Sequence, residues 1–226
     1  MTLQHPIEHD QASPAERGTR AKTPNRELAL KQYRLRSRFY DIELAAFEPI
    51  RRSAIARLQL KPGATVLDVG CGTGLSFELL KQGIGRRGHI VGIEQSPEML
   101  EQARRRVARQ GWTHVTLLNA PVEAAVLPSK ADAALFHFTH DILRNREAIG
   151  NIVQHLKPGA HVVAAGLAWG APWNLAANGF VLMAALYSVT ALEGLARPWS
   201  HLAEQVGEME VTQGAGVYIA STVVAR

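Results

Sequence analysis

Cysteine is almost absent from this chain, whose 226 residues include a single one, Cys71. One cysteine excludes an intramolecular disulfide and fits a reducing compartment. The segment from Met1 to Arg26 is polar and lacks the apolar core of a secretory signal peptide. We therefore expect a cytoplasmic protein.

Aromatic residues are scarce as well, at 6% of the chain, and no basic patch is interleaved with them. Proteins that bind single-stranded nucleic acid combine a basic groove with stacking aromatic side chains, and other nucleic-acid-binding proteins carry recognisable motifs. Neither feature is visible in the sequence. We therefore expect no RNA or DNA partner.

Charged residues are missing from one long stretch, residues 158–192, which contains no Asp, Glu, Lys or Arg. Its second part, residues 173–192, has the length of a membrane span. Small and polar residues interrupt that part, namely Asn174, Asn178, Gly179, Ser188 and Thr190. We expect a helix that covers the ligand edge of a sheet or packs on a partner, rather than a transmembrane helix. This helix belongs to an acceptor-side cover segment over residues 167–205.

The net charge of +5 arises in the first quarter of the chain. Residues 1–61 contain 12 Lys and Arg against 7 Asp and Glu, whereas the remaining residues contain 13 of each sign. Such a basic end can touch anionic lipid or an acidic substrate, although a solvated helix face is the more common explanation. A peripheral membrane contact through the basic N-terminal helix is therefore one of two open interpretations.

Length and composition, with 46% hydrophobic residues, predict one globular domain. Residues 1–25 are polar and contain three prolines, which is typical of a flexible extension. Apolar residues recur at helical spacing from Arg26 to Leu60 and predict a helical cap over residues 26–60. We expect the single domain to cover residues 26–226.

Strand-like and helix-like runs alternate from residue 64 onward. Strands are expected at 64–69, 89–93, 114–118, 131–136 and 160–165, and helices at 75–83, 97–110 and 145–156. Two further strands, at 206–213 and 216–225, form a hairpin-like end. Alternating strands and helices imply an α/β fold with parallel strands joined by right-handed crossovers.

A glycine-rich turn after the first strand is the most informative motif. Gly70, Gly72 and Gly74 form G-x-G-x-G, preceded by Asp68 and followed by a helix-like segment. Glycine permits positive φ and close backbone approach, and a helix start offers unpaired N–H groups. The spacing differs from the dinucleotide fingerprint G-x-G-x-x-G because position 75 is Leu. The turn therefore predicts a small polar ligand held against the backbone.

An acidic residue, Glu94, ends the second strand-like run, twenty residues after Gly74. Because the carboxyl ends of the first two strands are adjacent in an open parallel sheet, this side chain can accept both hydroxyls of a ribose. Asp68 can accept from an ammonium group or brace the loop. The structural alternatives to a ligand site are that the acid only caps a helix and that the glycines only form a tight turn.

The run from Val66 to Gly74, with Glu94 and Lys157-Pro158-Gly159, resembles the class I S-adenosylmethionine-dependent methyltransferases. The resemblance covers about residues 33–166. It implies a Rossmann-like, doubly wound, mostly parallel seven-stranded sheet whose last strand is antiparallel. It also implies S-adenosylmethionine as the cofactor.

The resemblance further implies which residues bind that cofactor. The glycine turn would lie against the methionine moiety, Glu94 would bind the ribose, and Asn119 matches the position that touches the adenine amine, where the family often has aspartate. Met99 flanks the adenosine in this comparison but fits a helix core equally well. The full set of implied cofactor-binding residues is Tyr40, Asp68, Gly70, Cys71, Gly72, Gly74, Glu94, Gln95, Met99, Asn119, Ala120 and His137.

His140 and Asp141 follow the fourth strand, at the place where the resemblance implies that an acceptor would arrive. A histidine can take a proton from a hydroxyl or ammonium acceptor because its ordinary pKa lies near neutrality. The alternative is a histidine that caps the next helix or binds the backbone. His137 and His140 lack a third ligand of suitable spacing, so no metal is expected.

These features predict the transfer of a methyl group from S-adenosylmethionine to an oxygen or nitrogen nucleophile of a small-molecule or lipid acceptor. Residues beyond the fifth strand are candidates for the acceptor pocket, namely Trp169, Trp173, Asn174, Tyr187 and Trp199, although the aromatic ones suit ordinary packing equally well. An NAD(P)-dependent oxidoreductase is one alternative, because Glu94 and a glycine turn serve that cofactor too. A non-catalytic cofactor-binding protein is another.

Overall fold

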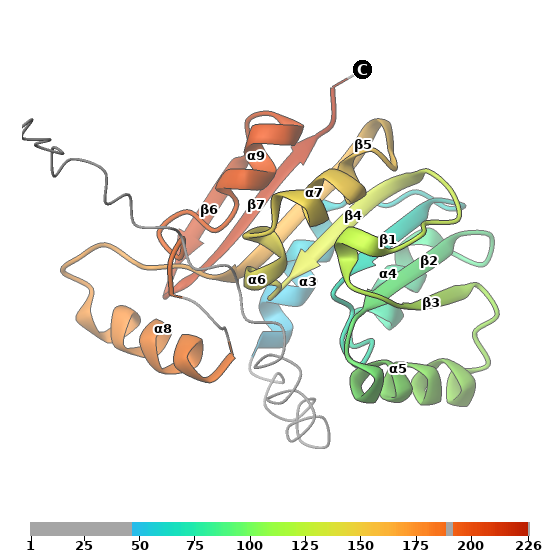
Figure 1. Ribbon diagram of the computed structural model, residues 1–226, viewed down its shortest axis with the longest axis horizontal. Helices are drawn as coiled ribbons and strands as arrows, with labels where there is room; N and C mark the ends of the chain where they lie inside the picture. Colours follow the sequence, from blue (N-terminus) through green and yellow to red (C-terminus); the bar gives the residue numbers. More distant parts are fainter. Residues whose placement is uncertain (1–46, 189–191, 226) are drawn as a thin grey trace, which may run out of the picture.

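A central sheet of seven strands organises the computed structural model, which describes residues 47–188 and 192–225 (Figure 1). Along the sheet the strand order is β3-β2-β1-β4-β5-β7-β6. The strands are β1 (Thr65–Val69), β2 (His89–Glu94), β3 (Val115–Asn119), β4 (Ala131–His137), β5 (Leu156–Leu167), β6 (Glu210–Gly214) and β7 (Val217–Val223). The expected extension over 1–25, most of the helical cap over 26–60 and Tyr40 lie outside the described residues.

Strand pairing confirms the predicted fold class. β1 pairs in parallel with β2 and β4, β2 with β3, and β4 with β5. β7 is antiparallel to both of its neighbours, β5 and β6. The chain therefore has the expected Rossmann-like, doubly wound, mostly parallel sheet with an antiparallel last strand, and the carboxyl ends of β1 to β4 share one edge.

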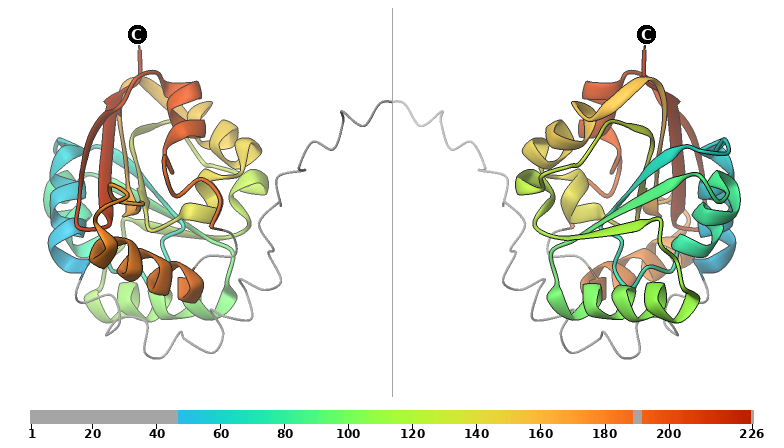
Figure 2. Two further views of the ribbon diagram at one scale, coloured as in Figure 1. Left: turned by 90° about the vertical axis from the view of Figure 1, so that its left-hand side faces the viewer. Right: turned by 90° about the vertical axis from the view of Figure 1, so that its right-hand side faces the viewer.

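Helices cover both faces of the sheet (Figure 2). One face packs on α3 (Glu48–Arg57), α4 (Phe77–Ile84) and α5 (Pro97–Gln110), and the other on α6 (His140–Leu143), α7 (Arg146–Val153) and α9 (Ser200–Val206). Successive residues of β1 alternate between the two cores, with Val66 in the first and Leu67 in the second. Burial on both faces explains why the strands are continuously apolar.

Several predicted boundaries shift because of local backbone geometry. The helix expected from residue 75 begins at Phe77, since Gly74 has φ +77° and belongs to the preceding turn. The strand expected from residue 206 is wrong in its first part: α9 extends to Val206, Gly207 ends it with φ +94°, and β6 begins at Glu210. The helix expected over 97–110 matches α5, whose N-cap Ser96 accepts a hydrogen bond from the Met99 N–H.

The cover segment over residues 167–205 contains two helices with different surroundings. α9 packs into the core beneath α7 through Leu202 and Val206. α8 (Leu175–Ser188) instead lies at the end of β5, where Val181 and Ala185 pack against Leu167 (Figure 1). Over the part of the chain that the structure describes, no helix combines the length and the apolar character that a membrane span requires.

Candidate functional site

The turn between β1 and α4 is held against the neighbouring strands at the carboxyl edge of the sheet. Its backbone N–H at Cys71 donates to the Ile93 carbonyl of β2 over 3.0 Å. Gly70 has φ +70°, and a Cβ there would lie 2.6 Å from Cγ2 of Thr139. A side chain at Gly70 is therefore excluded by backbone conformation and by the segment that leads into α6.

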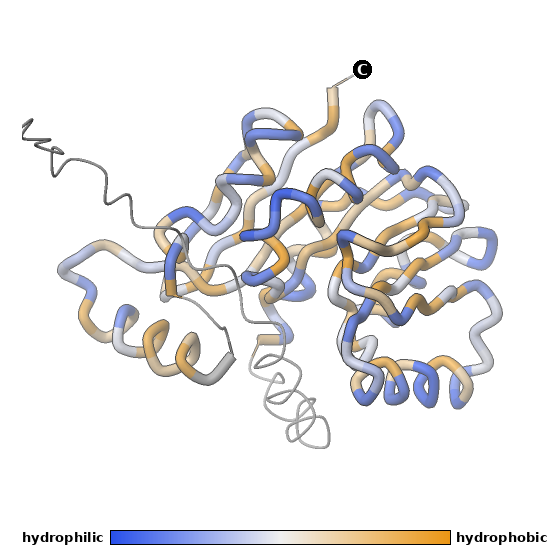
Figure 3. Tube along the Cα trace, in the orientation of Figure 1, coloured by the Kyte–Doolittle hydropathy of each residue, from blue (hydrophilic) through white to orange (hydrophobic). Residues whose placement is uncertain are grey.

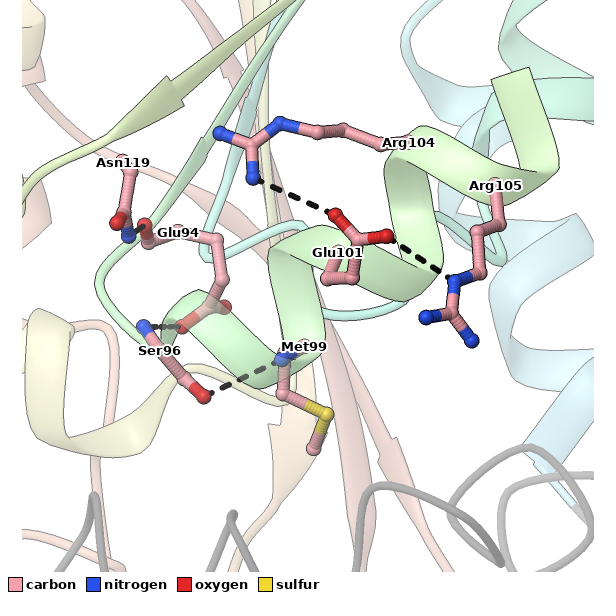
Figure 4. A network of polar contacts seen from close by, with 7 residues as sticks. All are labelled: Glu94, Ser96, Met99, Glu101, Arg104, Arg105 and Asn119. Carbon is pink, nitrogen blue, oxygen red and sulfur yellow. Dashed lines mark hydrogen bonds and ion pairs between the residues drawn. The ribbon is translucent and has the colours of Figure 1, made fainter. Parts of the chain in front are cut away.

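The carboxylate of Glu94 joins this turn to the end of β2. Oε2 accepts from the Gly72 N–H at 3.1 Å. Oε1 accepts from the Ser96 N–H at 2.7 Å, the contact that Figure 4 shows. Burial raises the pKa of Glu94, while the hydrogen bonds from the backbone act in the opposite direction. Each carboxylate oxygen retains a lone pair for another donor. Glu94 therefore braces the turn and still has acceptor capacity.

Asn119 ends β3 beside Glu94, and its amide is oriented by the neighbouring backbone. Nδ2 donates to the carbonyl oxygen of Glu94 at 2.9 Å (Figure 4) and to that of Gln95 at 3.3 Å. With the donor turned toward the backbone, Oδ1 of this exposed residue serves as the acceptor. Met99 is buried in the first turn of α5, as expected of a helix-core residue, while Ala120 packs at the margin of the core.

A buried acid, Asp68, stands at the carboxyl end of β1. Within residues 47–188 and 192–225, Oδ2 has no hydrogen-bond partner. Burial raises the pKa of Asp68 to about 7, against the influence of the Arg51 guanidinium and reinforced by Glu94. A buried polar atom without a partner is costly, so this oxygen marks a place where a donor is expected to bind.

Arg51 brings a buried positive charge to the same edge from α3. Its side chain is 3% exposed, whereas that of Arg52 is 64% exposed. Nη1 of Arg51 donates to the Glu48 carboxylate, but Nε and Nη2 have no hydrogen-bond partner in the described part of the chain. We did not predict this residue as part of the site, because nothing in its spacing separates it from the exposed arginine beside it.

His137 lies at the end of β4, within the electrostatic reach of Arg51. Burial, and then the charge of Arg51, lower the pKa of His137 to about 3, so the imidazole is neutral at pH 7. Its Nε2 has no hydrogen-bond partner among the described residues. The ring makes an edge contact with that of Phe138, with centroids 4.9 Å apart. Asp68, Arg51 and His137 thus bring unsatisfied polar atoms from three elements to one edge.

The predicted catalytic pair begins α6, next to the glycine turn. Nε2 of His140 lies 3.0 Å from the Glu193 carbonyl oxygen. Because a carbonyl only accepts, this nitrogen carries the proton in that contact. This is the contact expected if His140 binds the backbone, which was the alternative to a catalytic role. The roles of His140 and Asp141 as acid or base stay predictions.

An aromatic cluster borders the same edge. The Phe47 ring lies 4.7 Å from that of Phe138 and 6.2 Å from that of Phe180 on α8, measured between centroids. Trp199, which we considered for the acceptor pocket, is instead buried against Tyr218 at 4.9 Å and belongs to the core. In the described ranges, no group of three or more His, Cys, Asp and Glu side chains is arranged to hold a metal ion.

Comparison with known proteins places residues 66–159 in the family described as "Methyltransferase domain". One relative, an arsenite methyltransferase of Halobacterium salinarum, is 37% identical over 75 residues, which are 33% of this chain and 18% of the relative. Another, a 23S rRNA (uracil(1939)-C(5))-methyltransferase of Shewanella sediminis, is 33% identical over 87 residues, or 38% of this chain and 19% of the relative. Four relatives, among them the arsenite methyltransferase, are matched by this chain over only 18% to 39% of their own length.

Solved structures agree at the level of the fold. The N-methyltransferase NodS of Bradyrhizobium japonicum, in complex with S-adenosylhomocysteine, aligns with a TM-score of 0.58 at 19% identity, over 81% of this chain and 91% of that one. Residues 66–159 thus match the predicted family, and the solved structures share its fold. The names of the relatives cover different acceptors, so the acceptor does not follow from the family.

The effect of burying the Asp68 carboxyl group can be tested through the pH dependence of the free energy of unfolding. The unfolded pKa is near 3.8 and the folded pKa about 7, so folded Asp68 keeps a proton that the unfolded chain has lost. Its stabilising contribution is therefore complete below pH 4 and is lost as the pH rises toward 7 and above. Asp68→Asn should remove this loss, making the variant more stable than the wild type at pH 8 by on the order of 1.4 kcal/mol per unit of pKa shift.

Urea unfolding of both proteins without cofactor, between pH 4 and 8, measures this difference. Parallel profiles would mean that Asp68 is ionised throughout and that a donor within the protein already satisfies it.

Proposed function

We propose that this chain, whose residues 66–159 match a methyltransferase domain, is a class I S-adenosylmethionine-dependent enzyme that transfers a methyl group to an oxygen or nitrogen nucleophile of a small or lipophilic acceptor. The observation that carries the proposal is the row of polar groups at one edge of the sheet. Glu94 and Asn119 offer acceptors at the ends of β2 and β3, and Asp68 and Arg51 offer opposite charges at the other side of the glycine turn.

The adenosine end of S-adenosylmethionine fits the acceptors at β2 and β3. The ribose has two hydroxyl donors, and the oxygens of Glu94 can accept them while remaining bonded to the backbone. The adenine amino group is a donor and needs an acceptor. Asn119 presents Oδ1 because its Nδ2 is used by the backbone carbonyls. In this role the amide replaces the aspartate that is common in the family.

The amino-acid end of the cofactor fits the unsatisfied charges. Its ammonium group would donate to Oδ2 of Asp68, and its carboxylate would accept from Nε and Nη2 of Arg51. Both matches supply hydrogen bonds that the described protein atoms do not make among themselves. A new positive neighbour would also lower the pKa of Asp68 and favour its ionised form.

When bound, S-adenosylmethionine supplies a methyl group already activated on a sulfonium, so the residues of this chain have mainly to position the reactants and exclude water. With the cofactor bound, the nucleophile of the acceptor would take the methyl group in line, and the electron pair of the broken bond would stay on sulfur. An acceptor that starts as a hydroxyl or ammonium must also lose a proton, and His140 is our candidate for receiving it. Neutral His137, beside the sulfur in this arrangement, adds no positive charge that would repel a sulfonium.

Two observations support an apolar acceptor. The cluster of Phe47, Phe138 and Phe180 borders the edge where the acceptor would enter. The stretch over residues 158–192 carries no Asp, Glu, Lys or Arg. The lack of a basic patch interleaved with aromatic residues argues against a nucleic-acid acceptor. Cytoplasmic location stays a prediction.

Cofactor binding can be tested by calorimetry with S-adenosylhomocysteine. The wild type should bind it, and Glu94→Ala should weaken binding by on the order of 1–3 kcal/mol, because the ribose loses its acceptor and the turn loses its brace. Glu101→Ala is the matched control: it removes a carboxylate of α5 that pairs with Arg104 and Arg105 at the surface. Binding of NAD(H) without S-adenosylhomocysteine would overturn the proposal in favour of an oxidoreductase.

The proton-acceptor role is tested separately by His140→Ala. Release of S-adenosylhomocysteine in the presence of a panel of phenol, amine and quinol acceptors should fall about 100-fold or more, with cofactor affinity near that of the wild type. His155→Ala is the control, because its ring also contacts a backbone carbonyl, that of Asn151 at 2.7 Å, but at the end of α7. Unchanged turnover in His140→Ala would mean that this histidine only anchors α6 through its contact with the Glu193 carbonyl.

A further inference from the structure

Positive charge gathers at the edge of the sheet that lies opposite the glycine turn. Because β1 to β4 are parallel neighbours, their amino ends share this edge. Six Lys and Arg, but no Asp or Glu, occur in the segments that lead into these strands, which are residues 58–64, 81–89, 107–115 and 126–131. We call the six residues the amino-edge row: Lys61, Lys81, Arg86, Arg87, Arg109 and Lys130. Lys81 is half-buried, and the other five are exposed.

Acidic side chains do not neutralise the amino-edge row. Within residues 47–188 and 192–225, none of its six members forms an ion pair. Asp132, at the start of β4, is already bonded to Nζ of Lys157 at 2.8 Å and to the Thr65 N–H at 2.9 Å. Glu208 and Glu210 lie where β6 begins, at the other end of the strand order. The amino ends of β1 to β4 therefore carry an unbalanced positive charge.

A tight turn between α4 and β2 presents two of these cations. The Gly88 N–H donates to the Gly85 carbonyl over 3.4 Å and closes the turn. A Cβ on Gly88 would lie 2.8 Å from the Ala64 carbonyl oxygen, so the turn packs closely on the start of β1. Arg86 and Arg87 occupy its two central positions and are exposed, and they give the turn the hydrophilic colour of Figure 3. The fold thus fixes the backbone that carries both guanidinium groups.

Helix electrostatics account for only two members of the row. Lys81 and Arg109 lie in the last turns of α4 and α5, where a positive charge offsets the negative end of the helix. The other four lie in loops, outside the helices. Like charges repel one another, so gathering six of them at one edge is costly unless an anion binds there.

We propose that the amino-edge row binds the phosphate backbone of double-stranded nucleic acid without reading its sequence. Neighbouring strands are about 4.8 Å apart, so the four strand starts extend over about 14 Å. Over that length a duplex presents on the order of eight phosphate charges, at one per about 1.7 Å of its axis. Three of the six residues are arginines, whose planar guanidinium groups match pairs of phosphate oxygens. An extended row of cations therefore suits a linear polyanion.

The position of Trp112 favours a duplex over a single strand. Trp112 is the one Phe, Tyr or Trp of the four segments. Its ring is buried, with Nζ of Lys81 5.2 Å from the ring centroid. Proteins that bind single strands stack the bases on accessible aromatic rings, and this ring is not accessible. Contacts to the backbone of a duplex position it through cations alone.

This proposal revises our expectation of no RNA or DNA partner. That expectation rested on the lack of a recognisable motif and of a basic patch interleaved with aromatic residues. The six cations come from four separate segments, and only the parallel pairing of β1 to β4 brings them together. The nucleic acid is not the proposed methyl acceptor, because the acceptor would enter at the carboxyl edge and the row lies at the amino edge.

An anionic bilayer or an acidic protein fits the row less well. Stable attachment to a membrane surface combines charge with apolar insertion, and a specific protein interface has an apolar centre. Among the exposed large apolar residues of the described chain, the four segments contain Val126 alone. The row offers charge with almost no apolar surface, which matches a phosphate backbone.

Fluorescence anisotropy with a labelled DNA duplex of about 20 base pairs and mixed sequence tests the proposal. The full-length wild type should bind at about 50 mM NaCl, and log Kd should rise with log salt concentration with a slope of about 3–5. The double substitution Arg86→Gln with Arg87→Gln should weaken binding about tenfold or more and lower the slope by about 2. Lys61→Gln with Arg109→Gln, from two other segments, should weaken it similarly.

Arg52→Gln with Arg146→Gln is the matched control. It removes the same charge from two exposed arginines that pair with Glu48 and Glu204, away from the row. This variant should bind the duplex like the wild type. Circular dichroism and the affinity for S-adenosylhomocysteine should match the wild type in all variants, because the changes lie outside the cofactor edge.

Several results would overturn the proposal. One is no binding of the duplex by the wild type, and another is unchanged affinity of both row variants. An equal loss in the control would reduce the effect to net charge, and unfolding of both row variants would give the row a structural role. Tighter binding to vesicles of phosphatidylcholine with phosphatidylglycerol than to the duplex would assign the row to a membrane. Because the measurement needs neither cofactor nor methyl transfer, failure of the proposed function would leave it unaffected.

Discussion

The buried carboxylate of Glu94 is the interaction on which the rest of the cofactor edge depends. An ionised carboxylate in the protein interior is costly unless donors surround it, and the backbone N–H groups of Gly72 and Ser96 are those donors. Meeting that requirement draws the glycine turn against the end of β2 and fixes the start of α5. The same carboxylate then faces the space where a ribose is expected.

The opposite end of the edge has the reverse character, because some polar atoms of its charged groups make no hydrogen bond. Asp68 and Arg51 are buried with polar atoms that lack hydrogen bonds in the described part of the chain, and neutral His137 lies near them. A protein tolerates such groups where a ligand completes them. The satisfied acid therefore holds the shape of the site, and the unsatisfied charges supply attraction for a zwitterionic amino-acid group.

Local patterns predicted much of this architecture. The alternation of apolar strands and amphipathic helices, and the turn at Gly70 to Gly74, depend on near neighbours in sequence and were confirmed. The burial of Arg51 was not foreseen, and Trp199 was left open between the acceptor pocket and ordinary packing, because tertiary packing decides which arginine of a helix faces inward and which tryptophan joins the core. The orientation of the Asn119 amide likewise follows from carbonyl groups that meet it only in the folded chain.

A crystal structure of the protein with S-adenosylhomocysteine tests the central claim most directly. We predict the ribose hydroxyls on Glu94, the adenine amino group on Oδ1 of Asn119, and the amino-acid group between Asp68 and Arg51, completing Oδ2, Nε and Nη2. A ligand that leaves Oδ2 of Asp68 and Nε and Nη2 of Arg51 without partners, or one bound away from the carboxyl edge of the sheet, would contradict the account.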